Sequence, residues 1–219
     1  MLNSILDIET VRLVDDDPRS LESYGYTVED AELLAVPETG PLGSLENYLI
    51  NGSTKADAGL SDFELHTHSY AGFTGAELVA SWYKQSFPGI LCTRYEKAQI
   101  ERIRPYRRWI PVLLKPADLN PDSLMQGLES CLREIRGTFA PSRRPWRTQV
   151  HFLYKDTDTH DTFFAEVPGW AGSEILKIRL EDLPMNLRGM IHEDFRCHAF
   201  ANVGTEESED LYLCDWVIP

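Results

Sequence analysis

Short apolar runs alternate with amphipathic segments along the first 135 or so residues of the chain. Buried parallel strands read as short continuous apolar runs, whereas amphipathic helices repeat their apolar side chains every three or four residues. This alternation predicts strands at 11–14, 32–36, 56–65, 88–93 and 109–114, and helices at 18–31, 45–50, 76–85, 96–104 and 121–135. Strands that alternate with helices form a parallel sheet with right-handed crossovers and helices on both faces. A five-stranded parallel, doubly wound α/β domain is therefore predicted for residues 1–136.

The pattern changes to that of β structure after residue 147. Residues 137–147 are rich in Pro, Ser and Arg and are predicted to form a linker. Beyond them, strands are predicted at 149–154, 162–167, 174–180, 195–203 and 211–217, with a short helix or irregular turn at 183–190. Five short strands in about 70 residues predict a small β-rich barrel or sandwich domain over residues 148–219.

Composition narrows the class of protein. The 219 residues are 42% hydrophobic and 26% charged, which is typical of soluble globular proteins. No apolar run approaches the ~18–20 residues that a membrane helix needs, and residues 1–10 do not read as a signal peptide. The four cysteines are widely spaced and form no CxxC pair, so free thiols and a cytoplasmic location are expected.

The formal charge of −14 disfavours nucleic acid as a partner, because such binding depends on basic side chains that neutralise phosphates. From residue 132 onward the chain has 10 Lys and Arg against 15 Asp and Glu, and it shows no helix-turn-helix pattern. No Gly-x-Gly-x-x-Gly follows the first predicted strand, and no Walker-type phosphate loop occurs, so a nucleotide cofactor is not expected.

Polar side chains follow four of the predicted parallel strands. Asp15 and Asp16 follow the first strand, Asp62 the third, Thr93 the fourth and Lys115 the fifth. The carboxyl ends of parallel strands meet at one edge of a sheet, which is where ligands bind in this class of fold. Grouped carboxylates favour a hard cation such as Mg²⁺, and a hydroxyl and an ammonium group can hold phosphoryl oxygens. The set predicts phosphoryl chemistry at this edge.

These residues resemble the motifs of the receiver domain of two-component response regulators. The resemblance rests on Val14–Pro18 (VDDDP), Ser61–Leu65 (SDFEL), Ile90–Thr93 (ILCT) and Leu114–Pro116 (LKP). It implies a flavodoxin-like fold in which a partner histidine kinase or phosphotransfer protein phosphorylates Asp62. It also implies that Thr93 and Lys115 contact the phosphoryl group, and that the chain is no enzyme beyond self-phosphorylation and self-dephosphorylation. The implied Mg²⁺ ligands are Asp15 or Asp16, Asp62 and the backbone carbonyl of Glu64.

Three features depart from the family pattern. The loop at 66–74 is longer than the usual turn, and Val112 stands where an aromatic switch residue is common. Glu64 adds a negative charge beside the site. A pseudo-receiver that signals as an adaptor without phosphate therefore stays open.

A phosphatase uses some of the same residues differently. Haloacid dehalogenase-like phosphatases begin with Asp-x-Asp after the first strand, which Asp15 and Asp17 can supply as nucleophile and general acid. Thr93 and Lys115 match the order of the later motifs. The final acidic motif has no recognisable equivalent, and Asp62 would have no role.

The sequence leaves two interpretations open for each of several smaller features. His66 and His68 could bind a transition metal with Asp62, although loop histidines are usually solvated or hydrogen-bonded. Two arginine clusters could each be a basic patch. The first is expected instead to be a solvated loop, and it comprises Arg102, Arg104, Arg107 and Arg108. The second is expected to be a docking segment between the domains, and it comprises Arg143, Arg144 and Arg147. The C-terminal domain is expected to bind an unknown protein partner, and the sequence leaves open whether the chain forms a homodimer.

Overall fold

The computed structural model describes residues 7–51, 55–94, 97–159, 161–172 and 174–217. The chain divides into two compact units. The first comprises residues 1–95 and 109–138, and the second comprises residues 96–108 and 139–219.

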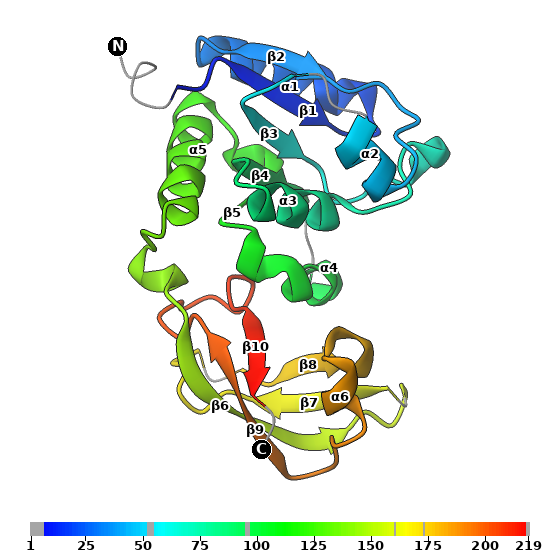
Figure 1. Ribbon diagram of the computed structural model, residues 1–219, viewed down its shortest axis with the longest axis vertical. Coiled ribbons are helices and arrows are strands. Elements are labelled where there is room, and N and C mark those ends of the chain that lie inside the picture. Colours follow the sequence, from blue (N-terminus) through cyan, green and yellow to red (C-terminus); the bar gives the residue numbers. More distant parts are fainter. Residues whose placement is uncertain (1–6, 52–54, 95–96, 160, 173, 218–219) are drawn as a thin grey trace. The chain divides into compact units, whose positions relative to one another are not determined.

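The first unit contains a five-stranded parallel sheet with the order β2-β1-β3-β4-β5, which is the flavodoxin-like order. Its strands are β1 (Thr10–Val14), β2 (Leu34–Pro37), β3 (Ala58–Ser61), β4 (Gly89–Cys92) and β5 (Val112–Leu114). Helices α1 (Pro18–Asp30) and α5 (Pro121–Ile135) cover one face, and α2 (Leu45–Asn51) and α3 (Gly75–Lys84) lie on the other (Figure 1). The predicted parallel, doubly wound α/β fold is confirmed.

Local sequence signals explain where these helices begin. The carboxylate of Asp17 accepts a hydrogen bond from the backbone N–H of Arg19 (3.0 Å), and Pro18 occupies the first turn of α1. Thr74 and Glu77 form a reciprocal capping box at the start of α3. Such caps satisfy backbone N–H groups that have no partner inside the helix.

The two faces of the sheet are packed differently. The face beneath α1 and α5 is a continuous apolar core that includes Leu13, Leu60 and Leu128. On the opposite face, Trp82 of α3 fills the space left by two glycines that are partners in register, Gly59 and Gly89. A Cβ atom at Gly59 would lie 2.4 Å from the Trp82 ring, and one at Gly89 would lie 2.7 Å from it. Glycine at both positions therefore lets the indole lie directly on the sheet.

The second unit contains an antiparallel five-stranded sheet with the order β10-β9-β6-β7-β8, which is visibly curled in Figure 1. Its elements are β6 (Trp146–Lys155), β7 (Thr162–Glu166), β8 (Leu176–Arg179), α6 (Met185–Arg188), β9 (Phe195–Ala201) and β10 (Leu213–Val217). Phe152, Trp170 and Leu187 lie in its apolar core. The five predicted strands and the β-rich character are confirmed, as a curled sheet.

The division of the chain differs from the predicted boundaries at two places. Residues 96–108, which carry α4 (Lys97–Ile103), group with the second unit, although helical periodicity alone assigns them to the first domain. The predicted linker at 137–147 contains a 3₁₀ helix, Pro141–Arg143, and the start of β6.

Buried arginines explain this grouping. Arg107 is 3% exposed and pairs with Asp210. Arg143 is 7% exposed, and its guanidinium donates to the carbonyl oxygens of Arg107 (3.0 Å) and Arg108 (2.9 Å). The hydroxyl of buried Tyr212 donates to the carbonyl oxygen of Arg143 (2.6 Å). The expectation of a solvated loop is therefore wrong for Arg107, because this side chain lies inside the second unit.

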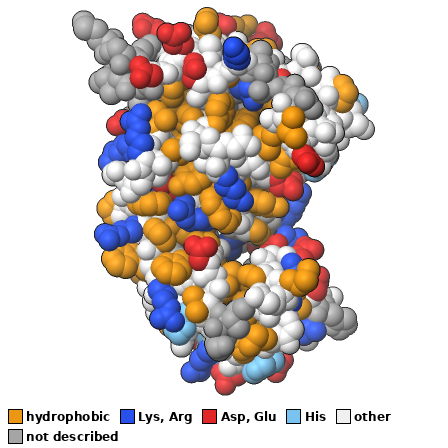
Figure 2. All heavy atoms as spheres, in the orientation of Figure 1, with side chains coloured by type: hydrophobic (Ala, Val, Ile, Leu, Met, Phe, Trp, Pro, Cys, Tyr) orange, Lys and Arg blue, Asp and Glu red, His pale blue; other side chains and the backbone are white. Residues whose placement is uncertain are grey.

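Among the residues that the structure describes, no large basic region is visible on the face drawn in Figure 2. Lys and Arg side chains are dispersed there among hydrophobic and other side chains. Within the described residues, no helix is long and apolar enough to cross a membrane.

A histidine on the second sheet joins two carboxylates. Nδ1 of His151 lies 2.8 Å from Oε1 of Glu166, and Nε2 lies 2.6 Å from Oδ1 of Asp194. Both ring nitrogens donate only when the imidazole is protonated. Hydrogen bonds to Glu166 and Asp194 accordingly raise the pKa of His151, and the bond to His151 is the main cause that lowers the pKa of Asp194.

This network is expected to make the stability of the second unit depend on pH. Because the folded-state pKa of His151 is raised, the network stabilises fully below the unfolded-state pKa of about 6.5 and is lost as pH rises through the folded value. His151→Gln should therefore lower the melting temperature under mildly acidic conditions and change it little under alkaline ones. Thermal denaturation across this pH range measures the difference, and an equal effect at both ends would contradict the prediction.

Candidate functional site

The predicted site residues lie at the carboxyl edge of the first sheet. Asp15 follows β1 and Asp62 follows β3, and these strands are neighbours with Val14 and Ser61 in register. The backbone N–H of Asp62 donates to the carbonyl oxygen of Val14 (2.9 Å). Thr93 follows β4, and its backbone N–H donates to the carbonyl oxygen of Leu114 at the end of β5 (2.9 Å). The sheet register thus brings Asp15, Asp62 and Thr93 to one edge.

Asp15 is a buried carboxylate among other acids. It is 3% exposed, and its Oδ1 accepts a hydrogen bond from the backbone N–H of Asp17 (2.8 Å). Burial, together with the negative charges of Asp62, Asp16 and Asp17, raises the pKa of Asp15 to about 7. A negative charge at this position is therefore poorly compensated by the protein itself.

Asp62 has partners suited to a phosphoacceptor. Its Oδ2 accepts from the backbone N–H of Glu64 (3.0 Å), and the neighbouring strand β4 leads to Thr93, which is 2% exposed. Burial raises the pKa of Asp62, although the bonds from Thr93, Phe63 and Glu64 act in the opposite direction. The buried Thr93 side chain is therefore close enough to the predicted phosphoacceptor to lower its pKa.

The other predicted residues lie at the rim of this edge. Oδ2 of half-buried Asp16 accepts from the backbone N–H of Thr67 (2.7 Å). Lys115 directly follows β5, and its side chain is exposed. Glu64 is half-buried, two residues beyond Asp62.

The long loop after Asp62 folds against the α2 side of the site. Ala71 forms a parallel bridge with Gly43, and the backbone N–H of Leu42 donates to the carbonyl oxygen of Tyr70 (2.6 Å). The Tyr70 hydroxyl donates to the carbonyl oxygen of Glu38 (2.9 Å). These contacts give residues 66–74 a defined conformation at the rim, beyond what the polar sequence predicts.

The transition-metal interpretation of His66 and His68 gains no support. Nδ1 of His66 lies 3.2 Å from the carbonyl oxygen of Ala71, within its own loop. His68 is exposed and has a positive φ of 53°. Across the described ranges, no group of three or more His, Cys, Asp or Glu could by itself hold a metal ion.

The acidic residues nevertheless suit Mg²⁺. This ion retains several waters and binds proteins through as few as one or two carboxylates, so it does not require a ready-made group of three. The raised pKa of buried Asp15 means that its negatively charged form is unfavourable in this environment, and a bound cation would stabilise that form. The oxygen donors of Asp15, Asp16 and Asp62 are the kind of ligand that this ion prefers.

Two buried residues beneath the site were missed by sequence reasoning. Tyr24 of α1 and Cys92, which immediately precedes Thr93, are both buried and influence each other's pKa. Burial raises the pKa of Cys92 to about 12, so the thiol is neutral at physiological pH. The spacing of Tyr24 with Leu21 and Val28 predicts a core position, and nothing in the sequence indicates where its hydroxyl points.

Asp17 is not arranged as the general acid of a phosphatase. It is exposed, and its carboxylate caps α1. The haloacid dehalogenase-like interpretation also leaves Asp62, which the sheet places beside Asp15, without a role.

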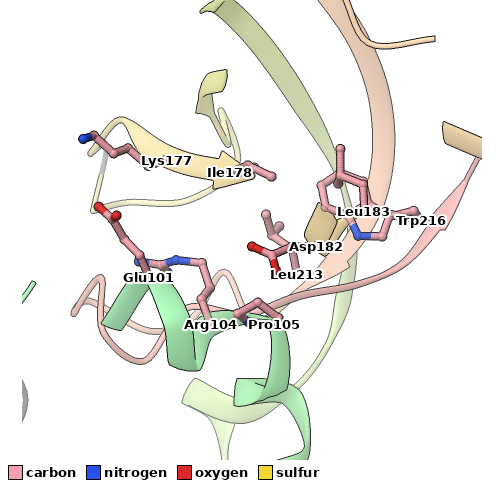
Figure 3. Close-up of a pocket in the computed structure, with 9 residues that line it drawn as sticks. All are labelled: Glu101, Arg104, Pro105, Lys177, Ile178, Asp182, Leu183, Leu213 and Trp216. Carbon is pink, nitrogen blue, oxygen red and sulfur yellow. The ribbon is translucent and has the colours of Figure 1, made fainter. Parts of the chain in front are cut away.

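A small pocket lies within the second unit, between α4 and the edge strands β8 and β10 (Figure 3). Nη1 of Arg104 donates to the carbonyl oxygens of Ser208 (2.7 Å) and Leu211 (2.9 Å), and burial lowers the pKa of Arg104 to about 10. The volume of about 30 Å³ suits about two water molecules rather than a small-molecule ligand. The residues around it are Glu101, Arg104, Pro105, Lys177, Ile178, Asp182, Leu183, Leu213 and Trp216.

Comparison with known proteins identifies a structural likeness. No protein-family model matches the sequence, and no curated protein matches it. A response regulator receiver domain protein from Clostridium thermocellum is 11% identical, with a TM-score of 0.43, and the match covers 59% of this chain and 98% of that chain. A CheY-like receiver domain protein from Methanospirillum hungatei is 17% identical, with a TM-score of 0.44 and coverage of 60% and 98%.

A third match is the signal receiver domain of a modulated diguanylate cyclase from Desulfovibrio desulfuricans, which is 18% identical, with a TM-score of 0.45 and coverage of 59% and 98%. The C-terminal part of the chain is not identified by these matches. These three solved structures are described as receiver domains, the family that the sequence motifs resemble.

Proposed function

We propose that the chain is a receiver-type signalling protein in which Asp62 accepts a phosphoryl group from a partner histidine kinase or phosphotransfer protein. The observation that carries this proposal is that the register of the parallel sheet places Asp62 beside buried Asp15 and buried Thr93 at one edge. Phosphoryl transfer requires mainly positioning and neutralisation of charge. This edge of the sheet supplies a carboxylate nucleophile, a hydroxyl donor and further acids.

Each residue has a defined part in the proposed transfer. A carboxylate oxygen of Asp62 forms a bond to phosphorus while the bond from phosphorus to the donor breaks and the leaving group keeps the electron pair. The Thr93 hydroxyl then donates to a phosphoryl oxygen, and Lys115 contacts a second one. Mg²⁺, when bound by Asp15, Asp16, Asp62 and the backbone carbonyl of Glu64, would neutralise charge on the phosphoryl oxygens.

The second unit is assigned the role of a protein-binding output. Residues 96–108 begin three residues after Thr93 in the chain and belong to this unit. A movement of Thr93 on phosphorylation would therefore be transmitted to α4 through the short stretch of chain that joins them. Arg104 and Arg107 tie the end of α4 and the turn after it to residues 208–211, so the unit can respond to such a shift.

Intact-mass spectrometry after incubation with acetyl phosphate and Mg²⁺ tests the proposal. The wild type should gain one phosphoryl group, whereas Asp62→Asn should gain none, because an amide does not form the acyl phosphate. Asp122→Asn, which changes an exposed aspartate in the first turn of α5, should behave as the wild type.

Two other outcomes would replace the proposal. Donor hydrolysis that persists in Asp62→Asn but is lost in Asp15→Asn would identify a phosphatase. Neither adduct nor hydrolysis in the wild type would identify a pseudo-receiver adaptor that signals without phosphate.

A further inference from the structure

Asp16 differs from the other acids at the carboxyl edge of the first sheet because its amide partner comes from a distant segment. The carboxylates of Asp15, Asp17 and Asp62 each accept a hydrogen bond from the backbone N–H two residues further along the chain. Oδ2 of Asp16 accepts instead from the backbone N–H of Thr67 (2.7 Å), 51 positions away. Because neighbouring carboxylates repel one another, this bond opposes a rotation of half-buried Asp16 away from them.

Tyr70 anchors the loop that carries Thr67. The backbone N–H of Tyr70 donates to the carbonyl oxygen of Thr67 (3.0 Å), so the two residues belong to the same tight turn. The Tyr70 hydroxyl donates to the carbonyl oxygen of Glu38 (2.9 Å), and its carbonyl oxygen accepts from the backbone N–H of Leu42 (2.6 Å). A Cβ atom at Gly40 would lie 2.4 Å from the Tyr70 ring, so the ring lies directly on this glycine.

The acceptor of the Tyr70 hydroxyl is itself fixed to the strand that ends at the acids. The backbone N–H of Glu38 donates to the carbonyl oxygen of Leu13 in β1 (2.8 Å). Oε1 of Glu38 lies 3.0 Å from Nε of Arg12 in the same strand, and both of these side chains are buried. Tyr70 therefore holds its loop at a fixed position relative to β1, which leads directly to Asp15 and Asp16.

The hydrogen-bond donors in this arrangement are uncharged. Burial raises the pKa of Tyr70, and the negative charges of Glu38, Asp15 and Asp16 add to this effect, so the hydroxyl is neutral at physiological pH. The donor to Asp16 is a backbone N–H group, which occupies one of about four acceptor positions on the two carboxylate oxygens. The loop thus orients Asp16 without a positive charge that would compete with a bound cation.

We propose that Tyr70 is a positioning residue for Mg²⁺ binding: it anchors the loop whose Thr67 N–H orients the Asp16 carboxylate toward the ion. The inference rests on the proposed function, because it concerns the cation of the same site. Loss of an outer hydrogen bond to a metal ligand typically weakens metal binding about 10–100-fold, and Tyr70 acts one step further out, so about three- to tenfold is expected.

Titration of the ¹⁵N-labelled full chain with MgCl₂, without a phosphodonor, tests the inference. The readout is the shift of the backbone amide signals of Asp16 and Thr67. Tyr70→Phe should raise the Mg²⁺ concentration at half-saturation about three- to tenfold. Tyr26→Phe is the matched control, because the Tyr26 hydroxyl is on exposed α1 surface and donates to Glu22 (3.0 Å), and it should titrate as the wild type.

A second variant and a second readout separate positioning from a loss of folding. Gly40→Ala keeps the Tyr70 hydroxyl but displaces its ring, and it should also raise the half-saturating Mg²⁺ concentration. With acetyl phosphate as donor, Tyr70→Phe should need correspondingly more Mg²⁺ for half of the maximal phosphoryl adduct and should reach the same maximum as the wild type. A lower maximum at saturating Mg²⁺ would indicate a structural defect and overturn the inference.

The outcomes also separate this inference from the proposed function. Equal half-saturation in the wild type and Tyr70→Phe, or no shift of the two amide signals in the wild type, would overturn the positioning role even if Asp62 is phosphorylated. Weaker Mg²⁺ binding by Tyr70→Phe would support the positioning role even if the wild type gains no phosphoryl group, and in that case only the proposed phosphoacceptor function would fail.

Discussion

Replacing Gly75 with alanine is expected to destabilise the first unit by about 3 kcal/mol or more, the upper part of the range for overpacked sites. A Cβ atom at position 75 would lie 1.6 Å from the backbone carbonyl oxygen of Asp62. The obstructing atom is backbone, so no side-chain rotation can relieve the clash. The start of α3 would have to move away from the phosphoacceptor, with loss of the hydrogen bond from the N–H of Gly75 to the carbonyl oxygen of Phe63 (2.9 Å).

Gly25→Ala is the matched control, because it makes the same substitution inside α1, where no heavy atom lies within 4 Å of the added Cβ. It should stabilise the protein by about 1 kcal/mol through the higher helix propensity of alanine. Urea denaturation followed by circular dichroism measures both midpoints. A midpoint for Gly75→Ala equal to that of the wild type would show that the close contact is not required.

Asp15→Asn is expected to stabilise the protein in the absence of Mg²⁺, by about 2 kcal/mol at pH 8 once solvent screening is allowed for. The pKa of Asp15 is raised from 3.8 to about 7 in the folded state. The folded protein therefore holds this proton more tightly than the unfolded chain, and wild-type stability should fall as pH rises through that interval. An amide keeps the hydrogen bond from the N–H of Asp17 and removes the buried charge.

In the presence of Mg²⁺, the wild type should be more stable than Asp15→Asn. A ligand that binds only the folded state raises the melting temperature by mass action, so Mg²⁺ should stabilise the wild type and have little effect on Asp15→Asn. Asp17→Asn removes a neighbouring charge while preserving the cap of α1, because Asn and Asp cap equally well. It should keep the Mg²⁺ response. Equal stabilisation of all three proteins by Mg²⁺ would remove Asp15 from the proposed set of ligands.

The fold of each unit was predictable because its elements carry strong local signals. The apolar run Val11–Val14 and the capped helix Pro121–Ile135 follow patterns that allow few alternatives. The grouping of residues 96–108 was not predictable, because it depends on arginines that contact residues about 100 positions away in the chain. An arginine-rich segment in sequence gives no sign that Arg107 is buried against Asp210.

Some residues of the candidate site were likewise predictable from the sequence, and others were not. Asp15, Asp62 and Thr93 were identified because each directly follows a strand, and parallel register then brings strand ends together. Tyr24 and Tyr70 were not identified, because a side chain can approach a site from a helix or a long loop without any motif. Trp82 is an ordinary core residue by its sequence pattern, and only the structure shows that its N–H has no partner among the described residues.

Borohydride trapping of the phosphorylated protein tests the central claim most directly. Sodium borohydride reduces an aspartyl phosphate to the corresponding alcohol, so the modified residue becomes homoserine and can be located by peptide mass mapping. After incubation with acetyl phosphate and Mg²⁺, the account predicts homoserine at position 62 and a requirement for Mg²⁺. Homoserine at position 15 instead, or an unmodified Asp62 in a protein that carries the phosphoryl adduct, would contradict it.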